Sequence, residues 1–254
     1  MTRLLASIAR ADEVEAALGG GADFVDVKDP AAGALGAAPE ATIREIVTLV
    51  AGRRPVSATV GDLPLDATVL AHAARRTARC GVDFVKLGLF PGGDLDGSLT
   101  ALAVEAQSGI RLVAVLFADS DPERVQLDQL AAAGFAGAML DTADKTSGSL
   151  TRHLGLDRLA QFVAHAKALG LLVGLAGSLG EEDVPRLAPL GVDYLGFRGA
   201  LCRGGRDGSL DVERVRRVRQ RLAAASNATA AAGADTAARS ATSGAPSTRV
   251  ARSA

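Results

Sequence analysis

Short apolar runs recur along the chain, and four of them follow a glycine in the same arrangement. These four segments are Gly21-Ala22-Asp23-Phe24-Val25, Gly81-Val82-Asp83-Phe84-Val85, Gly134-Phe135-Ala136-Gly137-Ala138 and Gly191-Val192-Asp193-Tyr194-Leu195. Glycine suits the left-handed backbone position after a helix, and an uninterrupted apolar run is typical of a strand buried on both faces. Other apolar runs lie between them, at residues 55–60, 112–118 and 171–176, and one more precedes them at residues 4–9. The pattern therefore predicts eight strands.

Amphipathic segments with helical spacing fill the gaps between these strands. Examples lie at residues 12–18, 41–50, 67–80, 157–169 and 212–222. Strict alternation of strand and helix favours parallel pairing, and eight such units close into a (β/α)8 barrel. An open doubly wound sheet is the alternative fold. No glycine-rich dinucleotide fingerprint follows the first strand, which argues against that alternative.

The chain has 254 residues, and a (β/α)8 barrel typically needs about 250. We expect one barrel domain over residues 1–222. From residue 223 the composition changes to alanine, serine, threonine and glycine without an apolar period, so residues 223–254 are predicted to be a disordered tail.

Composition and charge exclude several classes of protein. Hydrophobic residues make up 48% of the chain, charged residues 22%, and the formal net charge is −1. The arginines are scattered rather than clustered, which argues against a nucleic-acid partner or a membrane-surface partner. No apolar run reaches the roughly 18 residues of a membrane helix, and the N-terminal run leads into acidic residues, so we expect a cytoplasmic protein. The two cysteines, Cys80 and Cys202, are expected to be inert thiols.

Lysine is rare in this chain. Of 28 basic residues, only four are lysine: Lys28, Lys86, Lys145 and Lys167. Because arginine supplies the general charge, a retained lysine indicates a position that needs an amine able to lose its proton and attack a carbonyl. Lys167 falls on a predicted helix and is expected to be a surface charge.

The other three lysines fall near predicted strand ends, where the active site of such a barrel lies. Alternation places Asp26 and Lys28 on the same face of the second strand, with Lys28 nearer the mouth. Lys86 lies late in the fourth strand, and Asp141 ends the sixth with Lys145 four residues later. We therefore expect Lys28, Lys86, Asp141 and Lys145 to be catalytic and Asp26 to contact substrate.

A lysine in an apolar strand is costly to bury as an ammonium, so burial and a second ammonium would lower its pKa. A neutral amine adds to an aldehyde or ketone and forms a Schiff base. The alternative is a structural lysine whose ammonium pairs with Asp26 or Asp29. Two such lysines together, Lys28 and Lys86, favour catalysis.

The loops after the seventh and eighth strands are predicted to bind phosphate. They contain Ala176-Gly177-Ser178-Leu179-Gly180 and Arg198-Gly199-Ala200. Barrels of this kind commonly bind phosphate there through backbone N–H groups. Gly177, Ser178, Arg198 and Gly199 are thus expected to contact a phosphorylated substrate.

Further polar residues near the mouth are Ser57 and Thr59 on the third strand and Asp119 at the end of the fifth. Each is a candidate substrate contact, with an interior hydrogen-bonding role as the alternative. The three histidines, His72, His153 and His165, lack ligand spacing, and no cluster of carboxylates and histidines indicates a metal. We expect neither a metal nor a cofactor.

Several motifs occur in an order that resembles a known family. They are Asp26-Val27-Lys28-Asp29-Pro30, Ser57-Ala58-Thr59-Val60-Gly61-Asp62, Lys86-Leu87-Gly88-Leu89, Met139-Leu140-Asp141-Thr142, Leu175-Ala176-Gly177-Ser178 and Arg198-Gly199-Ala200-Leu201-Cys202. With these motifs, residues 4 to about 222 resemble the (5-formylfuran-3-yl)methyl phosphate synthase family.

The resemblance implies a carbon–oxygen lyase that joins two molecules of glyceraldehyde 3-phosphate. The product is 4-(hydroxymethyl)-2-furancarboxaldehyde phosphate, formed with release of phosphate and water on the pathway to methanofuran, a carrier in C1 metabolism. It further implies that Lys28 forms the Schiff base, that Lys86 accepts a proton, and that Asp141 and Lys145 assist.

Two alternatives remain open. One is another class I aldolase that acts on a phosphorylated aldehyde or ketone, and the other is a non-catalytic barrel that binds a phosphorylated metabolite. The partner expected in each case is a small phosphorylated compound. The sequence leaves open whether the chain forms a homo-oligomer.

Overall fold

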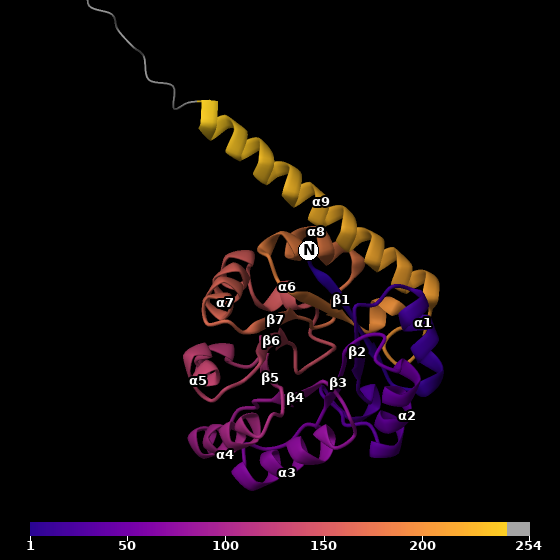
Figure 1. Cartoon of the computed structure of the whole chain (residues 1–254), viewed down its shortest axis with the longest axis vertical. Coiled ribbons are helices and arrows are strands. Elements are labelled where there is room, and N and C mark those ends of the chain that lie inside the picture. The colour runs from indigo at the N-terminus through magenta and orange to yellow at the C-terminus, as the bar shows by residue number, and fades with distance from the viewer. Residues whose placement is uncertain (243–254) are drawn as a thin grey trace, which may run out of the picture.

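A computed structural model describes residues 1–242 of the chain. Eight parallel strands form a closed barrel in sequence order, as predicted (Figure 1). The strands are β1 (Arg3–Ile8), β2 (Phe24–Val27), β3 (Val56–Thr59), β4 (Phe84–Gly88), β5 (Leu112–Phe117), β6 (Gly137–Asp141), β7 (Leu172–Leu175) and β8 (Tyr194–Phe197). The open doubly wound sheet is therefore not the fold.

Helices surround the barrel and alternate with its strands (Figure 1). They are α1 (Val14–Gly19), α2 (Glu40–Val50), α3 (Ala67–Ala78), α4 (Leu95–Gln107), α5 (Leu127–Ala132), α6 (Leu150–His153), α7 (Leu156–Ala168), α8 (Val184–Leu187) and α9 (Val212–Thr242). A short antiparallel hairpin, β9 (Cys202–Arg203) and β10 (Ser209–Leu210), follows β8 and was not predicted.

The repeated glycine motif has a structural explanation at the amino-terminal end of the barrel. Its four glycines all adopt a left-handed φ, between 78° and 90°, as the sequence predicted. In three copies the aspartate two residues later accepts a hydrogen bond from a backbone N–H at a neighbouring strand. These are Asp23 with Leu4, Asp83 with Val56 and Asp193 with Val173. The motif therefore ends one helix and aligns the next strand.

Large side chains fill the lower interior of the barrel. The rings of Phe24 and Tyr194 lie 5.5 Å apart, and the rings of Phe24 and Phe84 lie 6.4 Å apart. Gly174 leaves room for Tyr194, because a β-carbon at Gly174 would lie 2.3 Å from that ring. Because these rings fill the amino-terminal part of the barrel interior, the polar side chains lie nearer the carboxyl ends of the strands.

The strand register brings polar side chains of neighbouring strands side by side. Asp26 on β2 is paired with Ser57 on β3, and Thr59 on β3 is paired with Lys86 on β4. Because side chains alternate between the two faces of a strand, all four point to the interior. Each is buried.

The last helix, α9, extends past the predicted domain boundary at residue 222. Val215, Val218 and Leu222 of α9 are fully buried in the core, but the helix continues past Leu222 to Thr242. Residues 223–242, which the prediction placed in the tail, continue this helix, and their alanine-rich sequence has high helix propensity. The rest of the predicted tail, residues 243–254, lies outside the described residues.

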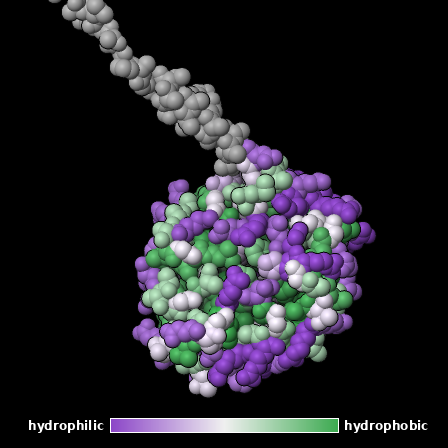
Figure 2. All heavy atoms as spheres, viewed as in Figure 1, coloured by the Kyte–Doolittle hydropathy of each residue, from purple (hydrophilic) through white to green (hydrophobic). Residues whose placement is uncertain are grey.

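The surface mixes polar and apolar residues. On the face drawn in Figure 2, hydrophilic side chains are interspersed with smaller apolar areas. Over the part of the chain that the structure describes, no helix combines the length and apolar character needed to span a membrane.

Candidate active site

A cavity of about 290 Å³ opens at the carboxyl ends of the strands. All four residues predicted to be catalytic and four of those predicted to bind substrate line it: Lys28, Lys86, Asp141, Lys145, Gly177, Ser178, Arg198 and Gly199. The structure thus brings together side chains from β2, β4, the end of β6 and the loops after β6, β7 and β8.

Asp26 and Lys86 form a buried ion pair beneath the cavity. The Lys86 amine donates to the Asp26 carboxylate at 3.0 Å, and both side chains are almost completely enclosed. The hydroxyls of Ser7 and Ser57 donate to the same carboxylate at 2.9 and 2.5 Å. Burial raises the pKa of Asp26, but the charges of Lys86 and Lys28 and these hydrogen bonds hold the pKa below its usual value. Asp26 is therefore ionised beneath the cavity rather than part of its wall.

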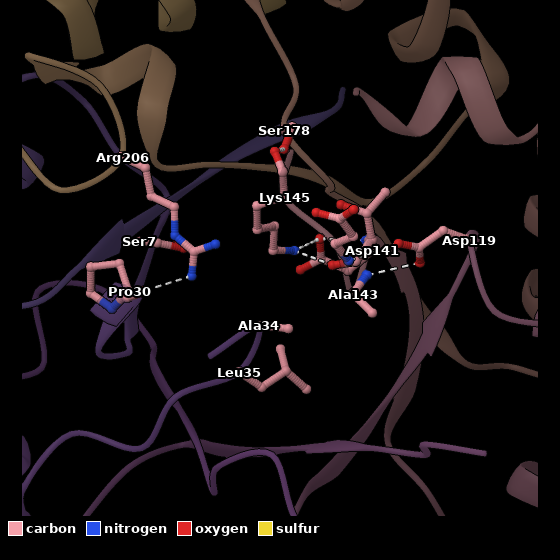
Figure 3. A network of polar contacts seen from close by, with 12 residues as sticks. Ser7, Pro30, Ala34, Leu35, Asp119, Asp141, Ala143, Lys145, Ser178 and Arg206 are labelled. Atoms are coloured by element: carbon pink, nitrogen blue, oxygen red, sulfur yellow. Dashed lines mark hydrogen bonds and ion pairs between the residues drawn. The ribbon is translucent and has the colours of Figure 1, made fainter. Parts of the chain in front are cut away.

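A second carboxylate–ammonium pair lies at the end of β6. The Lys145 amine donates to the Asp141 carboxylate at 2.5 Å and also to the Thr142 carbonyl. The Thr142 N–H donates to Asp141 at 2.8 Å. Burial raises the pKa of Asp141. The charges of Lys145 and Lys28 lower it by more than burial raises it, so the pKa of Asp141 lies below its usual value. Figure 3 shows this pair in the wall of the site.

The Lys28 amine has different surroundings from the other lysines. The side chain is 8% exposed, and among the described residues it has no hydrogen bond or ion pair. Asp29, a partner considered from sequence, instead accepts from the Ala31 N–H at 2.9 Å. Burial lowers the pKa of Lys28 to about 8; the charges of Lys145 and Lys86 lower it, whereas Asp141 and Asp26 raise it. A pKa of about 8 leaves part of the Lys28 amine neutral near neutral pH.

The loop after β7 lines the cavity with Gly177 and Ser178, which have backbone N–H groups available for a ligand. Gly177 and Ser178 have φ values of 106° and 48°, and within the described residues no acceptor is recorded for either N–H. The Ser178 hydroxyl donates to the Lys145 carbonyl at 3.2 Å, which links this loop to the loop after β6 (Figure 3). Successive free N–H groups of this kind suit an anion.

Arg198 lies in the cavity wall, but its guanidinium is bonded to other groups of the protein. Its guanidinium forms a bidentate ion pair with the buried Glu13 at 2.7 and 3.1 Å. It also donates to the carbonyls of Ser7, Arg206 and Gly208. All five of its N–H donors are thereby used, so the predicted side-chain contact with phosphate would require breaking an internal bond. Sequence analysis missed Glu13, because its partner lies 185 residues away.

Arg206 is a charged cavity residue that sequence analysis missed. It lies in the hairpin after β8, within the glycine-rich segment Gly204-Gly205-Arg206-Asp207-Gly208, which was the available signal. One guanidinium nitrogen, Nη2, donates to the carbonyls of Pro30 and Gly33 at 2.9 and 2.6 Å. Figure 3 shows the guanidinium pointing inward, across from Lys145.

Three residues predicted to contact substrate instead support the site from outside the cavity. Ser57 binds Asp26, and the Thr59 hydroxyl donates to the Gly36 carbonyl at 2.9 Å. The Asp119 carboxylate accepts from the backbone N–H groups of residues 143 and 144, both at 2.8 Å, and so holds the loop that carries Lys145 (Figure 3).

Asp62, from the loop after β3, plays a similar part that sequence analysis did not assign. Its carboxylate accepts from the N–H groups of Ala34 and Leu35 at 2.8 and 2.7 Å. The loop after β2 is therefore held by Asp62 on one side and by Arg206 on the other.

The family model of 4-HFC-P synthase matches residues 4–219, which is nearly the whole barrel. The chain belongs to this family. The resemblance inferred from the motifs is thereby confirmed.

Several relatives of this chain are named (5-formylfuran-3-yl)methyl phosphate synthase. A (5-formylfuran-3-yl)methyl phosphate synthase of Methanopyrus kandleri is 38% identical and covers 87% of this chain and 99% of its own length. The synthase of Methanothermobacter thermautotrophicus is 36% identical, with 86% and 98% covered. A Methylorubrum extorquens protein given the same name provisionally is 45% identical, with 90% and 95% covered.

Solved structures resemble this family member in fold. A thiamine phosphate pyrophosphorylase from Pyrococcus furiosus has a TM-score of 0.58 at 14% identity and covers 87% of this chain and 96% of its own. A phosphoribosyl anthranilate isomerase from Thermus thermophilus also has a TM-score of 0.58 at 14% identity, with 88% and 99% covered. At this identity they support the barrel fold alone.

Proposed function

We propose that this protein is a carbon–oxygen lyase that joins two molecules of glyceraldehyde 3-phosphate through a Schiff base on Lys28. The product is 4-(hydroxymethyl)-2-furancarboxaldehyde phosphate, on the pathway to methanofuran, and phosphate and water are released. Family membership and the names of the relatives support the product. The cavity geometry supports the chemistry.

The observation that carries the mechanism is the unpaired amine of Lys28. The other two lysines of the cavity each hold a carboxylate, whereas Lys28 has no partner among the described residues and its pKa is lowered to about 8. A substantial fraction of this amine is neutral near neutral pH, and the neutral amine is the nucleophile.

Imine formation begins when the Lys28 nitrogen bonds to the carbonyl carbon of one substrate. The carbonyl oxygen leaves as water after it is protonated. The resulting iminium withdraws electrons from the neighbouring carbon, which then loses a proton more easily. The enamine so formed attacks the aldehyde carbon of the second substrate and makes the new carbon–carbon bond. Elimination of one phosphate, closure of the furan ring with loss of water and hydrolysis of the imine then release the product and regenerate the Lys28 amine.

The two carboxylate–ammonium pairs supply the proton transfers in this proposal. The Lys86 amine donates a hydrogen bond to the Asp26 carboxylate in a buried site, so the two side chains act together in this step. Lys86 lines the cavity and therefore exchanges protons with the substrate, whereas Asp26 stabilises its charge from below. In this proposal Asp141 and Lys145, which line the same cavity as Lys28, act as the second proton-transfer pair.

The backbone around Gly177, Ser178 and Gly199 binds one substrate phosphate in this proposal. Gly177 and Ser178 offer N–H groups that have no acceptor within residues 1–242, and the Lys145 amine adds positive charge to the same cavity. Phosphate oxygens accept such hydrogen bonds strongly, because the acceptor is charged.

Borohydride trapping tests the mechanism. Incubating the protein with glyceraldehyde 3-phosphate and borohydride should reduce the imine to a stable adduct, which peptide mass spectrometry should locate on Lys28. Lys28→Arg should give no adduct and no turnover, whereas Lys167→Arg, a change at a surface lysine paired with Asp193, should retain both.

Mass spectrometry of the released product separates the remaining alternatives. A Lys28 adduct with a product other than the furan phosphate would indicate a different class I aldolase. Binding of substrate without any adduct would indicate a non-catalytic barrel, and an adduct that persists in Lys28→Arg would overturn the assignment of Lys28.

A further inference from the structure

The cavity wall is strongly cationic, but most of its charges are already balanced. Five basic side chains line it: Lys28, Lys86, Lys145, Arg198 and Arg206. Three of these form ion pairs with buried carboxylates: Lys86 with Asp26, Lys145 with Asp141 and Arg198 with Glu13. Within the part of the chain that the structure describes, Lys28 and Arg206 are the two cations of the wall without a carboxylate partner.

These two residues differ in chemistry. Lys28 has a lowered pKa and is the proposed nucleophile. A guanidinium stays protonated and presents planar pairs of N–H groups that match two oxygens of a phosphate. Arg206 uses Nη2 for the carbonyls of Pro30 and Gly33, while Nε and Nη1 have no acceptor recorded among the described residues. An unbalanced guanidinium with free donors in a cavity wall is suited to an anionic ligand.

The hairpin that carries Arg206 is held rigidly in place. The Arg198 Nε donates to the Arg206 carbonyl at 3.0 Å, and Glu13 accepts from the N–H of Leu210 at 3.0 Å. Since Arg198 and Glu13 are themselves a buried ion pair, the backbone of Arg206 is anchored to the barrel. The guanidinium is thereby positioned before any ligand binds, which reduces the entropy lost on binding.

We propose that Arg206 forms a second phosphate subsite, which binds the phosphate of the other glyceraldehyde 3-phosphate. This inference rests on the proposed function, because a reaction between two phosphorylated molecules brings two phosphates into one cavity. The N–H groups of Gly177 and Ser178 serve one phosphate, and Arg206 serves the phosphate that faces the loop after β2. Placing the anions at separate loops also keeps their negative charges apart.

The subsite can be tested without catalysis by counting bound phosphate. Equilibrium dialysis with labelled inorganic phosphate should give two sites on the full chain. Arg206→Gln should remove one site and leave one, and Ser178→Asp should remove the other through charge repulsion. Arg203→Gln is the matched control, because Arg203 lies in the same hairpin, outside the cavity, and should leave both sites.

Kinetics give a second measurement. Losing a charge-assisted hydrogen bond should raise the Michaelis constant of Arg206→Gln for glyceraldehyde 3-phosphate about tenfold to a hundredfold. The Michaelis constant for unphosphorylated glyceraldehyde should rise much less, because that compound carries no phosphate for Arg206 to bind. Arg206→Lys keeps the charge and should recover part of the phosphate binding.

Some outcomes would overturn the subsite. A single phosphate site that either Arg206→Gln or Ser178→Asp abolishes would mean that both loops bind the same anion. Two sites retained in Arg206→Gln, together with slower imine formation from glyceraldehyde, would mean that Arg206 only holds the loop after β2. Failure of borohydride trapping in the unmodified protein would reject the Lys28 mechanism without changing the phosphate count.

Discussion

Burial and the neighbouring charges have opposing effects on the pKa of Lys28. Burial and the ammonium groups of Lys145 and Lys86 favour its neutral form, whereas Asp141 and Asp26 favour its charged form. The balance leaves the pKa at about 8, so a small change at any of these neighbours should alter the pH range in which the amine reacts.

The rate of imine formation should follow the titration of Lys28. It should rise with pH as the amine loses its proton and level off above pH 8, where the neutral form predominates. Stopped-flow measurement of imine formation from glyceraldehyde between about pH 6 and pH 10 would show this. A rate that keeps rising toward the ordinary lysine pKa of 10.5 would contradict it.

Removing Lys86 should shift this profile without abolishing the imine. The positive charge of Lys86 lowers the pKa of Lys28, so Lys86→Met should raise that pKa and move the profile to higher pH. Later proton transfers should be lost, so turnover should fall by about 10²-fold or more. A variant that turns over normally and only binds substrate less tightly would instead indicate that Lys86 anchors phosphate.

Lys28 should also reduce the stability of the fold. Its pKa is about 8 in the folded protein, against the ordinary lysine value of 10.5 in the unfolded chain, so the unfolded chain binds more protons between these values. The resulting loss in the free energy of unfolding is therefore complete below pH 8 and disappears as the pH rises to 10.5. It is on the order of 3 kcal/mol.

Lys28→Met should accordingly be inactive and yet more stable than the unmodified protein near pH 7. Its advantage in free energy of unfolding should shrink above pH 8, the folded-state pKa of Lys28. Urea titrations at about pH 7 and pH 10 would measure it, and equal stability differences at the two pH values would contradict the assignment.

At the scale of elements, loops are held by carboxylates from neighbouring loops. Asp62 fixes the loop after β2, and Asp119 fixes the loop after β6 that carries Lys145. Backbone N–H groups in these loops have no strand or helix partner, so a charged acceptor both satisfies them and sets the loop position.

Asp119→Asn should disturb the loop after β6, because an amide offers one oxygen where the carboxylate offers two. We expect turnover to fall several-fold while the Lys28 imine still forms, since Asp119 lies outside the cavity. The matched control is Asp121→Asn, in the loop after β5 that also contains Asp119. Asp121 is exposed, and asparagine tolerates its φ of 44°. A normal turnover number in Asp119→Asn would exclude this positioning role.

The loop after β7 offers a separate test of the first phosphate site. A β-carbon at Gly177 would lie 3.0 Å from Thr142 at a φ of 106°, so an acidic residue there would strain the backbone as well as repel phosphate. Ser178 already carries a side chain in its left-handed conformation. Ser178→Asp should therefore raise the Michaelis constant at least about tenfold, whereas the uncharged Ser178→Asn should change it little. Similar kinetics in the two variants would argue against phosphate binding.

At the scale of the whole molecule, the last helix closes the barrel and then continues beyond it. Val215, Val218 and Leu222 are completely buried, and α9 packs against α1, α8 and β1. The part of α9 needed for the core therefore ends near Leu222, although the helix itself runs to Thr242 (Figure 1).

A chain that ends at residue 228 should fold like the full chain. We expect its melting temperature to change by no more than about 2 °C and its activity to be unchanged. Leu222→Ala should instead lower the free energy of unfolding by about 2–5 kcal/mol, because it leaves a cavity beneath the helix. A large loss of stability on shortening would assign residues 229–254 to the fold.

Much of the fold followed from the sequence, because it depends on local patterns. The eight apolar runs and the glycines between them predicted the barrel, and the period of two along a strand placed Asp26 and Lys28 on one face. The barrel rule then placed these residues, Lys86 and Asp141 at a common mouth. These inferences need only the order of residues along each element.

Only the tertiary structure decided which charged groups pair. Lys86 finds Asp26 across 60 residues, and Arg198 finds Glu13 across 185, which leaves Lys28 and Arg206, among the described cations of the cavity wall, without carboxylate partners. Such pairings depend on the positions of side chains that long loops and barrel closure bring together, and no local spacing encodes them. Sequence alone therefore proposed Lys28, Lys86, Asp141 and Lys145 as candidates but missed Arg206, whereas the surroundings of these residues in the folded chain determine which of them is free to react.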